Sequence, residues 1–188
     1  MRELLQRWWR ALTGPRILYG WRHADGRWLA HTRVSNSTRI EAPERLDIAD
    51  HVFIGHFNLV DASGGLTLGE GVQVSSHCAL LTHSSHQAVR VAGRAYWGHA
   101  EPPAFKRAAT AIGAYSFIGA HSVVAPGSRI GRGVLVRAFS YVSGAVPDFA
   151  IVAGQPAKVI GDTRQADADW LAAHPECRAD YEAWAGPQ

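Results

Sequence analysis

The sequence is poor in cysteine, with two in 188 residues. Cys78 and Cys177 lie far apart along the chain, and no CxxC or CxxH pair is present. A structural zinc site of the usual spacing is therefore not expected. A chain of this length buries a core without disulfides, so we expect a reduced, cytoplasmic protein.

Long apolar runs and blocks of like charge are also absent. No apolar stretch approaches the roughly 20 residues that span a bilayer, and the first residues lack the uninterrupted apolar segment of a signal peptide. The net charge is only +3 and the arginines are scattered, which argues against a nucleic-acid partner. A small anionic ligand is compatible with this balance.

One segment near the start is amphipathic. Residues 2–12, RELLQRWWRAL, are followed by Gly14 and Pro15, which stop a helix. Helical spacing places five apolar residues on one face and three arginines away from it: Leu4, Leu5, Trp8, Trp9 and Leu12, with Arg2, Arg7 and Arg10. We expect this helix to pack on its own body or on a neighbouring subunit, or to make a peripheral contact with the inner face of an anionic membrane.

The most informative pattern in the chain has a period of six residues. From residue 112 onward an aliphatic residue recurs at every sixth position: Ile112, Ile118, Val124, Ile130, Val136 and Val142. Small residues such as Ser116, Ser122 and Ser140 stand four positions after an aliphatic one. Neither a helix nor an alternating strand has this period, so the pattern indicates hexapeptide repeats.

The same spacing occurs earlier in three shorter runs, separated by two-residue shifts. These runs are Val34 and Ile40; Ile48, Ile54 and Val60; and Leu68, Val74 and Leu80. Each hexapeptide is one short strand and a turn, and about three of them close one coil of a triangular prism. We therefore predict an all-β parallel β-helix over residues 30–160, after an N-terminal helix and lead-in over residues 1–29.

Two segments depart from the repeat. Between Leu80 and Ile112 the period fails, and we expect residues 87–108 to form an excursion loop, since long insertions in regular solenoids usually carry function. Residues 161–188 contain Trp170 and Trp184 and are expected to form short helices that cap the open end of the prism.

These repeats resemble a known family, the hexapeptide-repeat acyltransferases, which include galactoside, maltose and polysaccharide O-acetyltransferases. The resemblance is carried by residues 111–161, ending in QPAKVI, and by residues 56–86, HFNLVDASGGLTLGEGVQVSSHCALLTHSSH. It implies a left-handed β-helix, a handedness that periodicity alone does not predict because left-handed crossovers are rare. It also implies a homotrimer with sites between subunits.

The chemistry implied by this resemblance is transfer of an acetyl group from acetyl-CoA to a hydroxyl or amine, with a histidine as general base and no metal. Imidazole suits this role, because its unperturbed pKa near 6.5 leaves it free to take a proton near neutral pH. The string THSSH contains two candidates, His83 and His86. Relatives commonly have a THxH-like string, so we read THSSH as that pattern with one added residue and favour His86, with His83 second.

The resemblance also suggests residues that bind acetyl-CoA. By position these are Ala120, Ala138, Ser143, Gly144 and Lys158. Small residues let the backbone approach the pantetheine arm, and the lysine suits phosphate groups. Plain repeat packing is the other reading of the two alanines.

On the acceptor side, Asn58 and Asp61 match positions that hydrogen-bond substrate hydroxyls in sugar-modifying relatives. Both residue types are also common at turns. Trp97, in the excursion loop, is suited to stack on a sugar ring. The expected acceptor is a sugar hydroxyl of a cell-surface glycan or its precursor.

Three other functions remain open at this point. An N-acetyltransferase acting on an amino sugar would use the same base and the same groove. A carbonic-anhydrase group of this fold binds zinc through histidines, and His51 and His56 have the H-x4-H spacing of that group. A non-enzymatic scaffold would not need the histidine-bearing break in the repeat.

Overall fold

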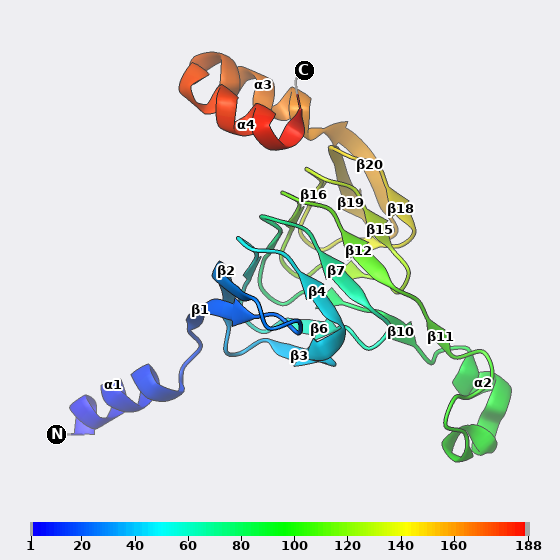
Figure 1. Cartoon of the computed structure of the whole chain (residues 1–188). Helices are drawn as coiled ribbons and strands as arrows, with labels where there is room; N and C mark the ends of the chain where they lie inside the picture. Colours follow the sequence, from blue (N-terminus) through cyan, green and yellow to red (C-terminus); the bar gives the residue numbers. More distant parts are fainter. Residues whose placement is uncertain (1, 187–188) are drawn as a thin grey trace.

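The protein is built on a triangular prism of short parallel strands, as the computed structural model, which describes residues 2–186, shows (Figure 1). The first face consists of β2 (Trp28–Ser35), β5 (Phe53–Ile54), β8 (Gln73–Val74), β13 (Phe117–Ile118), β16 (Leu135–Val136) and β19 (Ala150–Gly154). The second face consists of β3 (Arg39–Glu41), β6 (Leu59–Asp61), β9 (Ala79–Leu80), β14 (Val123–Val124) and β17 (Tyr141–Val142). The third consists of β4 (Leu46–Ile48), β7 (Leu66–Leu68), β12 (Thr110–Ile112), β15 (Arg129–Ile130) and β18 (Ala145–Val146).

The aliphatic residues of the six-residue period fill the interior of this prism. Ile54, Val60, Val74, Leu80 and Ile118 each have 0% of their surface exposed. Each inward side chain stacks on the equivalent residue of the next coil, because the strands of each face pair in parallel and in register. The predicted parallel β-helix is confirmed.

Coil length explains the two-residue shifts in the sequence pattern. In the lower coils Val60 pairs with Leu80, a step of 20 residues, whereas in the upper coils Val124 pairs with Val142, a step of 18. Three hexapeptides account for the shorter coil. The extra residues lie at the corner between the second and third faces, where the short helix η1 (Pro43–Arg45) separates β3 from β4.

The corners of the prism have backbone in the left-handed region. The first-second corner, between the first and second faces, has positive φ at Phe57, His77, His121 and Phe139. The rings of these four residues stack in one column, with centroid separations of 5.1, 4.9 and 4.8 Å. The third-first corner has positive φ at His51, Gly71, Tyr115, Gly133 and Phe149.

The N-terminal segment leaves the prism. Helix α1 (Arg2–Thr13) stands clear of the coils at their N-terminal end (Figure 1). Strand β1 (Ile17–Arg22) then pairs antiparallel with β2. No helix within residues 2–186 has the length and apolar content needed to cross a membrane.

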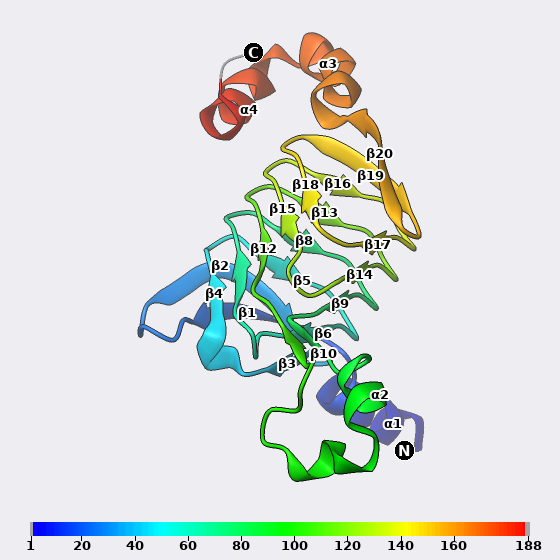
Figure 2. The ribbon, with the colours of Figure 1, turned by 90° about the vertical axis from the view of Figure 1, so that its right-hand side faces the viewer.

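The predicted excursion is present and begins at His83. Strands β10 (His83–Ser84) and β11 (Lys106–Arg107) pair antiparallel and form its base. The chain between them contains α2 (Ala88–Ala92) and η2 (Gly93–Gly98), which project away from the coils (Figure 2).

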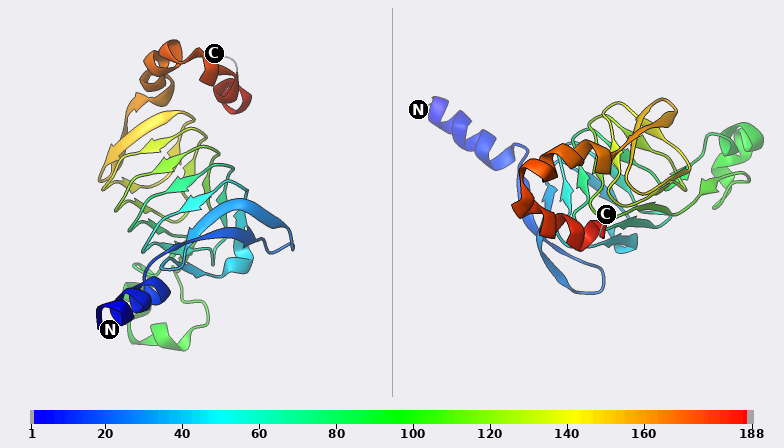
Figure 3. Two further views of the ribbon diagram at one scale, coloured as in Figure 1. Left: turned by 90° about the vertical axis from the view of Figure 1, so that its left-hand side faces the viewer. Right: turned by 90° about the horizontal axis from the view of Figure 1, so that it is seen from above.

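The C-terminal segment covers one side of the prism as well as its end. Strand β20 (Ala157–Asp162) pairs antiparallel with β19, and α3 (Thr163–Ala173), η3 (Pro175–Cys177) and α4 (Arg178–Ala185) follow. Trp184 of α4 packs on Tyr115 and Phe149 of the third-first corner, at ring separations of 4.7 and 5.9 Å. Seen from above, these helices therefore lie over one side of the coils (Figure 3).

Candidate active site

The register of the second face places an aspartate beneath the THSSH string. Because Val60 of β6 pairs with Leu80 of β9, Asp61 lies one coil below the residue that follows Leu80. The chain then turns outward at the second-third corner, between the second and third faces, and His83 is the first residue of β10. Residues 22 positions apart are thus adjacent in space.

The carboxylate of Asp61 is buried and fully hydrogen-bonded, with 1% of the residue exposed. Oδ2 accepts from the backbone N–H and the hydroxyl of Thr82, both at 2.8 Å, and Oδ1 accepts from the N–H of Ser63 at 2.9 Å. Burial raises the pKa of this carboxyl, but the hydrogen bonds from Ser63 and Thr82 outweigh burial and hold the pKa well below its usual range. The group is an acceptor-only carboxylate at neutral pH.

His83 is oriented by this carboxylate. Its Nδ1 lies 2.7 Å from Asp61 Oδ2 and 3.1 Å from the hydroxyl of Ser63. Since an ionised carboxylate can only accept, Nδ1 carries the proton of the neutral ring and Nε2 keeps its lone pair. The side chain is 38% exposed, and its ring stacks on Phe105 at a centroid separation of 5.6 Å. The arrangement leaves Nε2 able to accept a proton while the buried carboxylate holds Nδ1.

His86, the residue favoured from sequence, has a different environment. It is exposed, and its Nδ1 lies 2.8 Å from the hydroxyl of Ser84. The β10–β11 ladder starts at His83, so the chain has already left the corner when it reaches His86. The carboxylate is therefore next to His83, and the geometry favours His83 over His86.

Asn58 and Asp61 do not have the geometry expected of acceptor-binding residues. Asn58 is 3% exposed; its Nδ2 donates to the carbonyls of Gly55 and Ser75, and its Oδ1 accepts from the N–H of Cys78. The oxygens of Asp61 are used by Ser63, Thr82 and His83. The direct acceptor contacts expected from sequence are not supported, because neither side chain presents a free group to the surface.

Trp97, the third residue expected on the acceptor side, is 85% exposed on η2. Its ring makes an edge contact with Tyr96 at a centroid separation of 5.0 Å. Its role in acceptor binding stays a prediction.

The residues expected to bind acetyl-CoA lie at two edges of the second face and on β20. Ala120 and Ala138 stand at the first-second corner in consecutive coils, where the N–H of Phe139 donates to the carbonyl of Ala120 at 2.9 Å. Ser143 and Gly144 follow β17 at the second-third corner, the corner that carries His83. Lys158 is exposed on β20.

The histidine pair considered for zinc is separated by the fold. His51 and His56 flank the two-residue strand β5, so they stand at different corners of the prism. The Nδ1 of His56 lies 2.7 Å from the hydroxyl of Ser35. The two rings therefore do not converge on a common ion.

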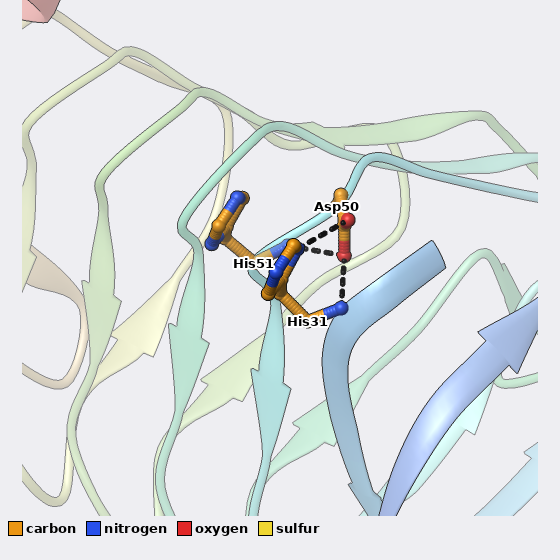
Figure 4. Close-up of side chains that lie close together, drawn as sticks. All are labelled: His31, Asp50 and His51. Carbon is orange, nitrogen blue, oxygen red and sulfur yellow. Dashed lines mark hydrogen bonds and ion pairs between the residues drawn. The ribbon is translucent and has the colours of Figure 1, made fainter. Parts of the chain in front are cut away.

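A different histidine group stands at the third-first corner, formed by His31, Asp50 and His51 (Figure 4). The two imidazoles stack at 4.4 Å with an interplanar angle of 2°, so their in-plane lone pairs run parallel. Asp50 Oδ1 accepts from the backbone N–H groups of His31 and His51, and Oδ2 lies 3.1 Å from His31 Nδ1. Burial raises the pKa of Asp50, but these hydrogen bonds lower it to about 2. Stacked rings and a fully bonded carboxylate favour a hydrogen-bonded group that stabilises the corner over tetrahedral metal ligation.

Sequence reasoning missed the Asp61–His83 pair and the contributions of Ser63 and Thr82. The register contained the signal, because coils of 20 residues place position 61 directly below position 81. Counting along the coil would have shown that an acid lies beneath THSSH.

Comparisons with known proteins agree with this architecture. Residues 109–144 match the family model described as bacterial transferase hexapeptide (six repeats). The chain is 27% identical over 136 residues to a protein of Mycobacterium tuberculosis named as an acetyltransferase, which covers 72% of this chain and 42% of the relative. It is also 27% identical over 122 residues to an Escherichia coli K12 protein named as a lipopolysaccharide biosynthesis O-acetyltransferase, which covers 60% of this chain and 58% of the relative. The chain thus spans about half the length of these relatives.

Solved structures share the fold. A maltose O-acetyltransferase from Clostridium difficile 630 superposes with a TM-score of 0.54 at 18% identity, over 68% of this chain and 64% of that chain. The N-acyltransferase AntD from Bacillus cereus, solved as a variant with dTDP and coenzyme A, superposes with a TM-score of 0.56 at 18% identity, over 76% of this chain and 89% of that chain. The fold is therefore the left-handed parallel β-helix of hexapeptide-repeat proteins, as the sequence resemblance implied.

Proposed function

We propose that this hexapeptide-repeat chain is an acetyl-CoA-dependent O-acetyltransferase that modifies a sugar hydroxyl, with His83 as its general base. The observation that carries the proposal is the 2.7 Å contact between His83 Nδ1 and the buried carboxylate of Asp61. It gives the ring one tautomer and one orientation, with Nε2 as the basic atom. The family resemblance and the names of the curated relatives support the reaction class.

In this proposal His83 acts first as general base and then as general acid. Acetyl-CoA supplies the acetyl group as a thioester. Nε2 of His83 accepts the proton of the acceptor hydroxyl as its oxygen forms the new ester bond, and it returns that proton to the sulfur when the carbon–sulfur bond breaks. Asp61 is a positioning residue that stabilises the transient imidazolium through Nδ1.

The second face has features that suit the donor. Ala120 and Ala138 are small, so an extended pantetheine arm can reach the coil backbone beside them. A Cβ at Gly144 would meet no atom within 4 Å, so this position has space beside the backbone. Lys158 supplies a cation for phosphate groups. We keep these residues and Ser143 as the proposed donor site, and we keep Trp97 of the excursion on the acceptor side.

The proposed assembly is a homotrimer with sites between subunits. The His83 side chain is 38% exposed at a corner of the prism, so in this proposal the chain encloses the site only in part. A neighbouring copy would supply the other wall. The proposed setting is the cytoplasm, with a glycan or its precursor as acceptor.

Thiol release from acetyl-CoA tests this function. We expect release in the presence of at least one member of a panel of sugars and glycan precursors, and the acetylated product identifies the atom that was modified. Transfer to amino sugars alone would instead favour N-acetylation, which the same base would support. Absence of transfer to every acceptor, together with absence of CoA binding by calorimetry, would rule out the enzyme.

A further inference from the structure

One end of the prism collects exposed apolar and basic side chains that the proposed proton transfer does not use. Helix α1 and the excursion containing α2 both lie at the N-terminal end of the coils, whereas α3 and α4 lie at the opposite end (Figures 1 and 2). The two segments project on opposite sides of the coils when the molecule is seen from above (Figure 3). We call this the N-terminal end, comprising residues 2–35 and 83–108.

Large apolar side chains are exposed at the N-terminal end. On α1, Leu4, Leu5 and Trp8 are 60%, 65% and 65% exposed. On the excursion, Val91 is 61% and Trp97 is 85% exposed. Exposed tryptophan and leucine on projecting elements are a costly arrangement unless another surface covers them.

The same end is strongly basic. Residues 1–35 contain seven arginines and two acidic residues, and residues 83–108 contain four basic residues and one acidic residue. At the other end, residues 162–188 contain six acidic residues and two arginines. A chain with a net charge of only +3 is therefore polarised along the axis of the prism.

We propose that the N-terminal end binds an anionic phospholipid surface, with α1 lying in the membrane interface. An amphipathic helix of this kind places its apolar side chains at the level of the acyl chains and its arginines among the headgroup phosphates. The excursion adds a second contact through Val91. Charge complementarity favours an anionic surface over a second N-terminal end, which would carry the same positive charge.

The size of the contact fits reversible, peripheral binding. A 12-residue helix exposes too little apolar surface to anchor a protein permanently, so the arginines are expected to contribute much of the affinity. Binding should therefore weaken as salt screens the charges. It does not depend on the transferase reaction, so it can be measured without substrate.

Co-sedimentation of the full chain with vesicles tests the inference. We expect binding to phosphatidylcholine vesicles containing phosphatidylglycerol that is at least about tenfold tighter than binding to phosphatidylcholine alone, and that weakens with added salt. Replacing Arg2, Arg7 and Arg10 together by Gln should weaken binding by about a hundredfold, at roughly fivefold for each charge. Replacing Leu4, Leu5 and Trp8 together by Gln should weaken it at least about tenfold.

A matched triple variant controls for the loss of exposed apolar surface. Val159, Ile160 and Trp170 are 58%, 54% and 62% exposed near the acidic end, and replacing all three by Gln should leave binding within about twofold. Far-ultraviolet circular dichroism and thermal melting establish that each variant folds. Tryptophan fluorescence provides a second measurement that relies on a single substitution. Adding vesicles should shift the emission of the wild type to the blue, and the shift should be smaller in Trp8→Gln.

Three results would overturn the inference. The first is equal binding to neutral and anionic vesicles. The second is an unchanged affinity in both α1 variants. The third is a change of oligomeric mass in the α1 apolar variant without vesicles, which would show that the helix covers another subunit.

Discussion

His83 and His86 are only three positions apart, yet their rings have different partners. Nδ1 of His83 faces the Asp61 carboxylate at 2.7 Å, whereas Nδ1 of His86 faces the Ser84 hydroxyl at 2.8 Å. A buried carboxylate stabilises imidazolium far more than a neutral hydroxyl does. We therefore assign the proposed proton transfer to His83 and not to His86.

Alanine substitutions distinguish the two histidines. We expect His83→Ala to lower kcat by about 10²–10⁴-fold, the usual contribution of a general base. His86→Ala is the matched control and should stay within a few-fold of the wild type. Thiol release from acetyl-CoA measures both, and near-normal turnover in His83→Ala would refute the assignment.

Asp61→Asn tests the positioning role. An amide can donate a hydrogen bond to Nδ1, which would favour the tautomer with its proton on Nε2. Nε2 could then not accept the proton of the acceptor hydroxyl. We expect kcat to fall by at least about tenfold while the KM for acetyl-CoA changes little. A rise in KM with kcat unchanged would mean that Asp61 belongs to substrate binding.

The depressed pKa of Asp61 also predicts an acid-sensitive contribution to stability. Because the carboxyl has a lower pKa in the folded chain than its ordinary 3.8, its contribution is complete above that value and is lost as the pH falls towards the folded pKa. Urea unfolding should therefore show the wild type more stable than Asp61→Asn at pH 7, with the difference shrinking below about pH 4. A difference that stayed constant to pH 2 would contradict this cause.

The ring column at the first-second corner offsets part of the conformational free energy that its left-handed backbone costs. Each non-glycine residue with left-handed φ costs about 1–2 kcal/mol, and Phe57, His77, His121 and Phe139 all have it. Stacking of aromatic pairs contributes about 0.5–1.5 kcal/mol each beyond burial, so the three stacked pairs recover part of this cost. Such columns form only when residues at one corner lie in register.

Neighbouring coils approach some glycines so closely that an added side chain would destabilise the fold. A Cβ at Gly119 would lie 2.5 Å from the backbone nitrogen of Ala138, whereas a Cβ at Gly98 would meet nothing within 4 Å. We expect Gly119→Ala to lower the free energy of unfolding by about 1–3 kcal/mol, with Gly98→Ala as the near-neutral control. Urea denaturation measures both; equal stabilities would show that the coils can separate without cost.

Charge reversal at Lys158 on β20 tests the proposed acetyl-CoA site. Lys158→Glu should raise the KM for acetyl-CoA severalfold with little change in kcat, because a negative charge would repel phosphate groups in the bound and the transition state alike. Arg178→Glu, which also reverses an exposed charge but on α4, is the control. An unchanged KM in Lys158→Glu would remove the residue from the site.

The proposed homotrimer predicts the molecular mass of the whole protein in solution. Light scattering after size exclusion should give about three times the chain mass of 20.4 kDa. Three parallel prisms would then place three basic N-terminal ends on one side, which would strengthen binding to a surface through multivalency. A monomer at working concentrations would remove the second wall of the proposed site.

The prism follows from the six-residue period of the sequence. A side chain pointing inward at every sixth position, as at Ile118 and Val124, is a local property of the repeat, so the fold and the excursion between Leu80 and Ile112 could be predicted. Counting coils of 20 residues places an acid beneath THSSH, but the choice of His83 over His86 required the three-dimensional structure, because the β10–β11 ladder turns the chain outward at His83. The contacts of Asn58 likewise depend on the next coil, because its amide bonds to the backbone of Ser75 and Cys78.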